Sequence, residues 1–108
     1  MTVKELAEKY SFEVLSLPQP DRIVSGGYVG DLLSWVMGRA EADNAWMTIM
    51  TNVNIVAVAA LSDVSVIIIT EGAKPDNSVV ETALAKGVNI LVAEDTAFAV
   101  AVKISSDI

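Results

Sequence analysis

The chain has 108 residues, of which 53% are hydrophobic and 19% are charged, whereas soluble proteins average roughly 45–50% apolar residues (glycine included) and 25% charged residues. One domain spanning residues 1–108 fits this length, and in so small a domain the surplus of apolar side chains favours burial in a subunit interface. The net charge of −7, with seven basic residues scattered along the chain, disfavours nucleic acid and anionic membranes as partners.

A capping box formed by Thr2 and Glu5 opens the first predicted helix, over residues 2–10. One face of this helix is apolar and consists of Val3, Leu6, Ala7 and Tyr10. Charged residues occupy the place where a signal peptide would have its apolar core, and the chain has no cysteine, so we expect a cytoplasmic protein. A strand follows over residues 12–17, because Pro18 and Pro20 cannot continue its hydrogen bonding.

The segment 23–37 predicts a short strand at 23–24, a turn at Gly26 and Gly27, and a helix that runs from a cap at Asp31 to residue 37. A glycine pair ahead of a helix can present backbone N–H groups to an anion. The favoured interpretation is a plain turn that uses the positive φ open to glycine. No Walker lysine follows, and the Asp31 carboxylate would repel phosphate.

Residues 28–37 contain more large apolar side chains than one buried helical stripe can hold. Aromatic and Met side chains are enriched in interface cores. The segment is therefore the first candidate for the interface of a homodimer, through the side chains of Tyr28, Leu32, Trp35 and Val36. The alternative is that the whole segment is core, with Trp35 packed beneath the first helix.

Residues 45–70 predict a β-α-β unit, with strands over 46–50 and 64–69 and a helix over 55–61. The second strand is apolar at almost every position. Both of its faces must then be covered, which is typical of a buried parallel strand. The apolar runs are too short and too often interrupted to span a bilayer.

Strand and helix continue to alternate to the end of the chain. A helix runs from a cap at residue 76 or 77 to residue 86 and is stopped by Gly87, and a strand follows over 88–93. Asp95 or Thr96 caps the last helix, whose packing residues are Phe98, Ala99, Val102 and Ile104. This alternation predicts an α/β fold with three layers, α/β/α, and a largely parallel sheet.

The carboxyl ends of parallel strands are the usual ligand face of such sheets. If the three central strands are neighbours, the polar residues that follow them form one rim. The candidate ligand-binding residues are Thr51, Asn52, Asn54, Thr70, Glu71, Gly72, Glu94, Asp95 and Thr96. The alternative is that each is a helix cap or a turn residue. The acidic residues lack a cation-binding spacing such as an EF-hand loop, so neither a metal nor a cofactor is predicted.

The block from Ile67 to Val100, IIITEGAKPDNSVVETALAKGVNILVAEDTAFAV, resembles the DRTGG domain family. In that family an apolar strand ends in Thr-Gly-Gly, a Pro-Asp opens a helix, and an Asp-Thr near a second strand end opens the last helix. The Thr-Gly-Gly falls on residues 70–72, where Glu71 replaces the middle glycine. The family's Asp-Arg pair falls on Thr51 and Asn52 and is not retained, and Asp21 with Arg22 lies too early in the chain to replace it.

The resemblance implies a regulatory role and not a catalytic one. DRTGG domains are accessory modules beside CBS domains in some inorganic pyrophosphatases and ahead of the catalytic part of some phosphotransacetylases, and they are similar in fold to the N-terminal domain of HPr kinase. In those enzymes the domain is linked to dimer formation. A free-standing copy would then act as a homodimer that binds something else, such as a metabolic or signalling protein.

Three hypotheses for the function follow, in this order of preference. The first is a non-catalytic regulatory or protein-interaction module that acts as a homodimer. The second is a small-molecule sensing domain, with nucleotides among its candidate ligands, that uses the loops at the strand carboxyl ends. The third is an enzyme, which is not favoured: without His or Cys its general base would be a carboxylate such as Glu71, Glu94 or Asp95, and nothing distinguishes one of them.

Overall fold

The computed structural model describes residues 1–108 and contains one five-stranded sheet with the strand order β1-β5-β4-β3-β2. The strands are β1 Glu13–Ser16, β2 Gly27–Val29, β3 Ala45–Thr48, β4 Val66–Ile69 and β5 Ile90–Val92. The helices are α1 Val3–Tyr10, α2 Leu33–Arg39, α3 Asn54–Ser62, α4 Asn77–Lys86 and α5 Ala97–Ile104. Strands β2 to β5 are parallel, and β1 pairs antiparallel with β5.

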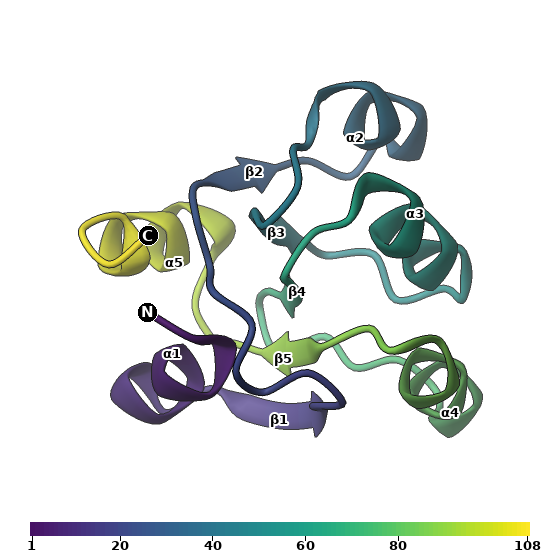
Figure 1. Cartoon of the computed structure of the whole chain (residues 1–108), viewed down its shortest axis with the longest axis horizontal. Coiled ribbons are helices and arrows are strands. Elements are labelled where there is room, and N and C mark those ends of the chain that lie inside the picture. Colours follow the sequence, from purple (N-terminus) through teal and green to yellow (C-terminus); the bar gives the residue numbers. More distant parts are fainter.

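The helices cover both faces of the sheet (Figure 1), with α1 and α5 to its left in this view and α2, α3 and α4 to its right. Each helical layer closes its own apolar core: Leu6 and Ile104 belong to the core on the α1 and α5 side, and Val36 and Ile55 to the core on the other. The three-layer α/β/α prediction and the largely parallel sheet are confirmed.

Strand β4 lies at the centre of the sheet between β3 and β5, and all of its residues are buried. Successive side chains of a strand point to opposite faces. Val66 and Ile68 accordingly enter the core beneath α1 and α5, while Ile67 and Ile69 enter the core beneath α2 to α4. Full burial of each such side chain stabilises the fold by about 1.5–3 kcal/mol, which is why the predicted two-sided strand is found.

The predicted helix ends are largely confirmed. Thr2 Oγ1 accepts a hydrogen bond from Glu5 N at 3.1 Å, and Glu5 Oε1 accepts one from Thr2 N at 2.8 Å, which completes the capping box. Gly87 ends α4 at φ +74°, and Thr96 caps α5 by accepting a hydrogen bond from Ala99 N. The chain's last turn is tied back to α1, because Asp107 accepts hydrogen bonds from Lys9 and Tyr10, which lower the pKa of that carboxyl.

The segment 23–37 departs from its prediction. Ile23 makes only an isolated bridge to Thr2, and the edge strand is β2, which begins at Gly27 after Gly26 turns the chain at φ +72°. Asp31 does not cap α2. Its carboxylate accepts hydrogen bonds from Thr48 Oγ1 at 2.7 Å and from Ile49 N at 2.9 Å, so it binds the end of β3, and α2 begins at Leu33.

The packing predicted for α5 is correct at Ile104, which is buried, and wrong at Phe98 and Val102, which are exposed. Ala99 is partly buried, and the prediction missed the buried Val100. Val100 and Ile104 are four residues apart and share the face of α5 that packs on the sheet, so Phe98 and Val102, each two residues away, lie on the opposite side. None of the five helices has both the length and the apolar character needed to cross a membrane.

Candidate functional site

The carboxyl ends of β3, β4 and β5 lie side by side, because these strands are neighbours in the sheet. The polar residues that follow them therefore reach one edge, as predicted. Their side chains do not form one continuous rim. Thr51 and Asn52 line one hollow, Glu94 and Asp95 line another, and the five other candidates line neither.

The turn after β4 is closed by its own hydrogen bonds. Glu71 and Gly72 both have left-handed backbone conformations, with φ values of +60° and +66°. Glu71 N donates to Asp95 O at 2.8 Å, and Gly72 N donates to Ala93 O at 2.9 Å. Both backbone N–H groups are thus hydrogen-bonded within the protein. The turn joins the β4–α4 loop to the β5–α5 loop and leaves neither N–H group free to bind an anion.

Gly72 and Thr70 have structural reasons for their residue types. A Cβ on Gly72 would lie 2.5 Å from Glu94 Oε2, in addition to its left-handed φ. Thr70 is buried, and its backbone N–H donates to Thr48 O at 2.9 Å. Thr70 is thus removed from the candidate contacts, because the end of β4 is still paired with β3 at this point.

The first hollow, of about 430 Å³, lies between the β3–α3 and β4–α4 loops. Its polar lining is made of Thr51 and Asn52 from the first loop, Lys74 and Asp76 from the second, and Ser78 from the first turn of α4. Asn52 is also a turn residue, as the alternative to ligand binding predicted, because its Oδ1 accepts a hydrogen bond from Asn54 N at 3.0 Å. Asn54 itself is the exposed first residue of α3 and does not line the hollow.

Lys74 is the residue of this hollow that the sequence prediction missed. Its ammonium lies 2.9 Å from Glu13 Oε1, and this carboxylate raises the pKa of Lys74. The signal was available: Lys74 is the only basic residue in the loops that follow the parallel strands. The predicted cap, at Asp76 or Asn77, is in the right place: Asp76 directly precedes α4, although its side chain makes no capping hydrogen bond. Asp76 also lines the hollow, together with Ser78 of the first turn of α4.

The second hollow, of about 370 Å³, lies at the end of β5 between β1 and α5. Glu94 and Asp95 line it together with Tyr10 and Glu13, and Asp95 pairs with Lys103. Thr96 is outside it and caps α5. The acidic side chains do not converge: no group of three or more carboxylates is close enough to hold a metal ion.

Two of the four predicted interface residues are exposed at the surface, Leu32 and Trp35, and Tyr28 is half-buried. Val36 is completely buried in the core beneath α2 to α4, so it is not an interface residue. Helix α2 packs on α3, and Val36 is its only fully buried side chain because the helix has just two turns. Trp35 lies on the outer side, where the Arg39 guanidinium stacks 4.1 Å from its ring centre.

Arg22, which follows Asp21 in the sequence, has a structural role. Its guanidinium donates hydrogen bonds to the carboxylates of Asp43 at 3.1 Å and Asp63 at 2.8 Å. It thereby joins the long connection before β2 to the amino ends of β3 and β4. This position is at the opposite end of the strands from the two hollows.

Comparison with known proteins agrees with the resemblance found in the sequence. No curated protein matches the chain. Among solved structures, it is similar to the CBS and DRTGG domains of the regulatory region of Clostridium perfringens pyrophosphatase, determined in complex with an activator, diadenosine tetraphosphate. The TM-score is 0.70 at 15% identity over 93% of this chain, which spans 44% of the other, so the likeness is one of fold. The DRTGG domain profile matches residues 36–106, more than half of the chain, and the protein therefore belongs to the DRTGG domain family.

Proposed function

We propose that the protein is a non-catalytic regulatory module that acts as a homodimer, with residues 1–108 working as one unit and with a metabolic or signalling protein as its target. The observation that carries this proposal is the apolar surface of α2 and the turn before it. Leu32 is 62% exposed, Trp35 is 55% exposed and Met37 is 52% exposed, all within six residues.

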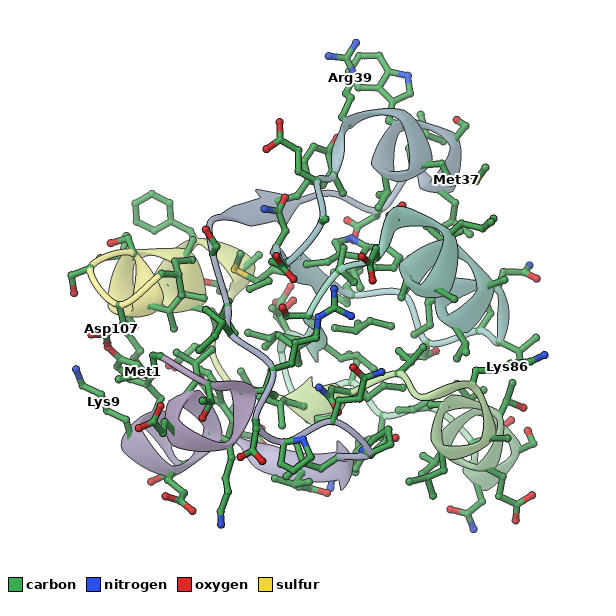
Figure 2. The ribbon with its side chains drawn as sticks, in the orientation of Figure 1. Met1, Lys9, Met37, Arg39, Lys86 and Asp107 are labelled. Carbon is green, nitrogen blue, oxygen red and sulfur yellow. The ribbon has the colours of Figure 1, made fainter.

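Such an apolar surface is unusual on a protein that functions as a monomer. Soluble proteins rarely leave large contiguous apolar patches in water, and aromatic, Met and Arg side chains are enriched in interface cores. Helix α2 supplies Trp35, Met37 and Arg39, of which Arg39 stacks on Trp35. Figure 2 shows Arg39 and Met37 on different sides of this helix, at the periphery of the molecule. The side chains are placed where a second subunit can cover them.

The polar edge of the sheet supports the non-catalytic part of the proposal. Four of its charged side chains are engaged in two ion pairs, Lys74–Glu13 and Lys103–Asp95. The turn at Glu71 and Gly72 uses its backbone donors to hold two loops together. The same family of domain occurs in the regulatory region of the pyrophosphatase to which the fold is similar.

Replacing Trp35 by Glu tests the dimer. We expect the wild type to sediment as a dimer and Trp35→Glu to sediment as a folded monomer, because a charge within an apolar interface is desolvated without a partner. Leu84→Glu is the matched control, since Leu84 is exposed on α4, away from α2, and the variant should remain dimeric. A monomeric wild type contradicts the proposal, and a Trp35→Glu protein that lacks a folded circular dichroism spectrum assigns Trp35 to the core.

A second candidate function is small-molecule sensing, with a nucleotide as ligand. The hollow that contains Lys74 favours it, because this side chain is a cation beside the hydroxyl and amide groups of Thr51, Asn52 and Ser78. Its volume of about 430 Å³ lies within the range of roughly 300–1,000 Å³ that is usual for ligand pockets. The structure to which the fold is similar was solved with diadenosine tetraphosphate.

This second candidate is tested by thermal melting in the presence of diadenosine tetraphosphate. Ligand that binds the folded state raises the melting temperature, so we expect a rise of several degrees in the wild type and little or none in Lys74→Ala. Lys4→Ala is the control, because Lys4 is on α1, remote from the hollow. An unchanged melting temperature of the wild type at millimolar ligand, or an equal rise in Lys74→Ala, rejects nucleotide sensing at this hollow.

A further inference from the structure

We propose that β2 pairs with β2 of a second copy of the chain in the antiparallel direction, so that the two sheets continue into one another across the dimer axis. This inference rests on the homodimer proposed above and names the surface that forms it. It follows from the hydrogen-bonding state of β2, from the lack of protection at that edge, and from the distribution of charge.

Strand β2 is an edge strand whose outer backbone groups have no partner within the chain. It is parallel to β3 alone, with Tyr28 opposite Trp46. At its two ends Gly26 O accepts from Ala45 N at 3.0 Å, and Gly30 N donates to Met47 O at 3.2 Å. Residues of a strand bond alternately to either side, so the N–H and C=O groups of Gly27 and Val29 face away from β3.

The two edges of the sheet differ in how they are protected. At the other edge, β1 has an irregular register between Val14 and Ser16, is followed by Pro18, and begins with Glu13 in an ion pair with Lys74. Bulges, prolines and charges are the usual devices that prevent an edge strand from pairing with another chain. Strand β2 has none of them, and only its short length limits its pairing.

Charge identifies the occupant as a second copy. Each chain has a net charge of −7, so most surfaces of two copies repel. From residue 23 to residue 38 the only charged side chain is Asp31, whose carboxylate accepts hydrogen bonds from Thr48 and Ile49. This strip contains β2 and has Asp31 as its single charge, so it is where two such chains can meet with the fewest like charges close together.

The strip is also complementary to itself. A two-fold axis through Tyr28 would place Gly27 opposite Val29 of the second copy, and both outward-facing residues of each strand could then exchange their backbone hydrogen bonds. Because β2 has only three residues, apolar side chains beside it must contribute. Val29 is 50% exposed on the strand itself, and helices α2 and α5, which both carry exposed apolar residues, lie on either side of β2 (Figure 1).

Val29→Pro tests the pairing, since it removes an outward N–H that makes no bond to β3, and proline is tolerated at edge strands. We expect Val29→Pro to raise the dissociation constant of the dimer, measured by sedimentation equilibrium, by at least about tenfold. Val29→Ala keeps the backbone donor and should raise it much less. In the wild type, the amides of Gly27 and Val29 should exchange with deuterium more slowly as protein concentration rises through the dissociation constant.

The outcomes separate this inference from the proposed function. A wild type that is monomeric contradicts both. A dimeric wild type whose Gly27 and Val29 amides exchange at a rate independent of concentration overturns the β2 pairing and leaves the homodimer standing, as does a Val29→Pro protein that dimerises as tightly as Val29→Ala. The exchange measurement needs no variant, so it decides the question even where Val29→Pro fails to fold.

Discussion

Ile68→Asp is expected to unfold the protein at 25 °C. Ile68 is completely buried in the middle of β4, in the core between the sheet and the layer of α1 and α5, and no cation lies among the residues of that core. Burying an unpaired carboxylate costs several kcal/mol in addition to the lost apolar contacts. Since the whole stability of such a domain is about 5–15 kcal/mol, circular dichroism should show loss of the cooperative thermal transition.

Glu71→Gly is the control for this experiment. Glu71 is exposed, three residues further along the chain, in a left-handed conformation with φ +60° that glycine adopts without strain. Relief of that strain and the greater flexibility of the unfolded chain oppose each other, so the free energy of unfolding should change by less than about 1 kcal/mol. Equal melting temperatures for the two variants would contradict the burial of Ile68.

The order and type of most elements could be predicted because their signals are local. Four consecutive β-branched residues in β4 require cover on both faces, and Thr2 with Glu5 determines the start of α1 without help from the rest of the chain. The glycine at the end of α4, Gly87, likewise predicts a left-handed backbone conformation at that position by its residue type alone. Such features depend on residues a few positions apart, which a single sequence displays.

What could not be predicted depends on partners distant in the sequence. Asp31 is a favoured residue type for a helix cap and precedes an apolar run, but Thr48 and Ile49 bind its carboxylate once β2 and β3 are adjacent. The apolar segment 28–37 was expected to work as one surface, yet the short α2 must bury Val36 against α3 and leaves Trp35 outside. Which apolar side chain is buried is decided by the direction of the helix axis, which the pattern alone does not give.

The candidate site shows the same division. The edge of the sheet at which the candidates gather follows from the parallel topology and was predicted. Their separation into two hollows follows from two backbone hydrogen bonds between the β4–α4 and β5–α5 loops, Glu71 N to Asp95 O and Gly72 N to Ala93 O. The bonded residues are 24 and 21 positions apart in the sequence. Backbone hydrogen bonds between distant loops cannot be predicted from the residue types of those loops. Lys74 could have been identified as the only basic residue in the loops that follow the parallel strands, but its ion pair with Glu13, which is in another element, could not.

Asn89 is a further residue whose role emerges only in three dimensions. It precedes β5, and its side chain, on a residue only 2% exposed, makes three hydrogen bonds. Its Oδ1 accepts from Gln19 N at 2.9 Å, and its Nδ2 donates to Gln19 O at 2.8 Å and to Ser65 O at 3.0 Å. The amide therefore joins the connection between β1 and β2 to the start of β4.

Asn89→Asp is expected to lower the free energy of unfolding at pH 7 by about 3–5 kcal/mol, because a buried carboxylate would face two carbonyl oxygens that have lost their donor. These oxygens and the burial raise the pKa of the new carboxyl above its unfolded value, so the folded variant binds the extra proton more readily and the loss should shrink as the pH falls. Urea unfolding of the variant and the wild type at pH 7 and at about pH 4.5 measures both effects. Asn52→Asp is the matched control: Asn52 is exposed and its Oδ1 only accepts a bond, from Asn54 N, so that change should stay within about 0.5 kcal/mol. A similar small change for Asn89→Asp, or a loss that does not depend on pH, would show that the Asn89 amide is not the buried bridge between Gln19 and Ser65.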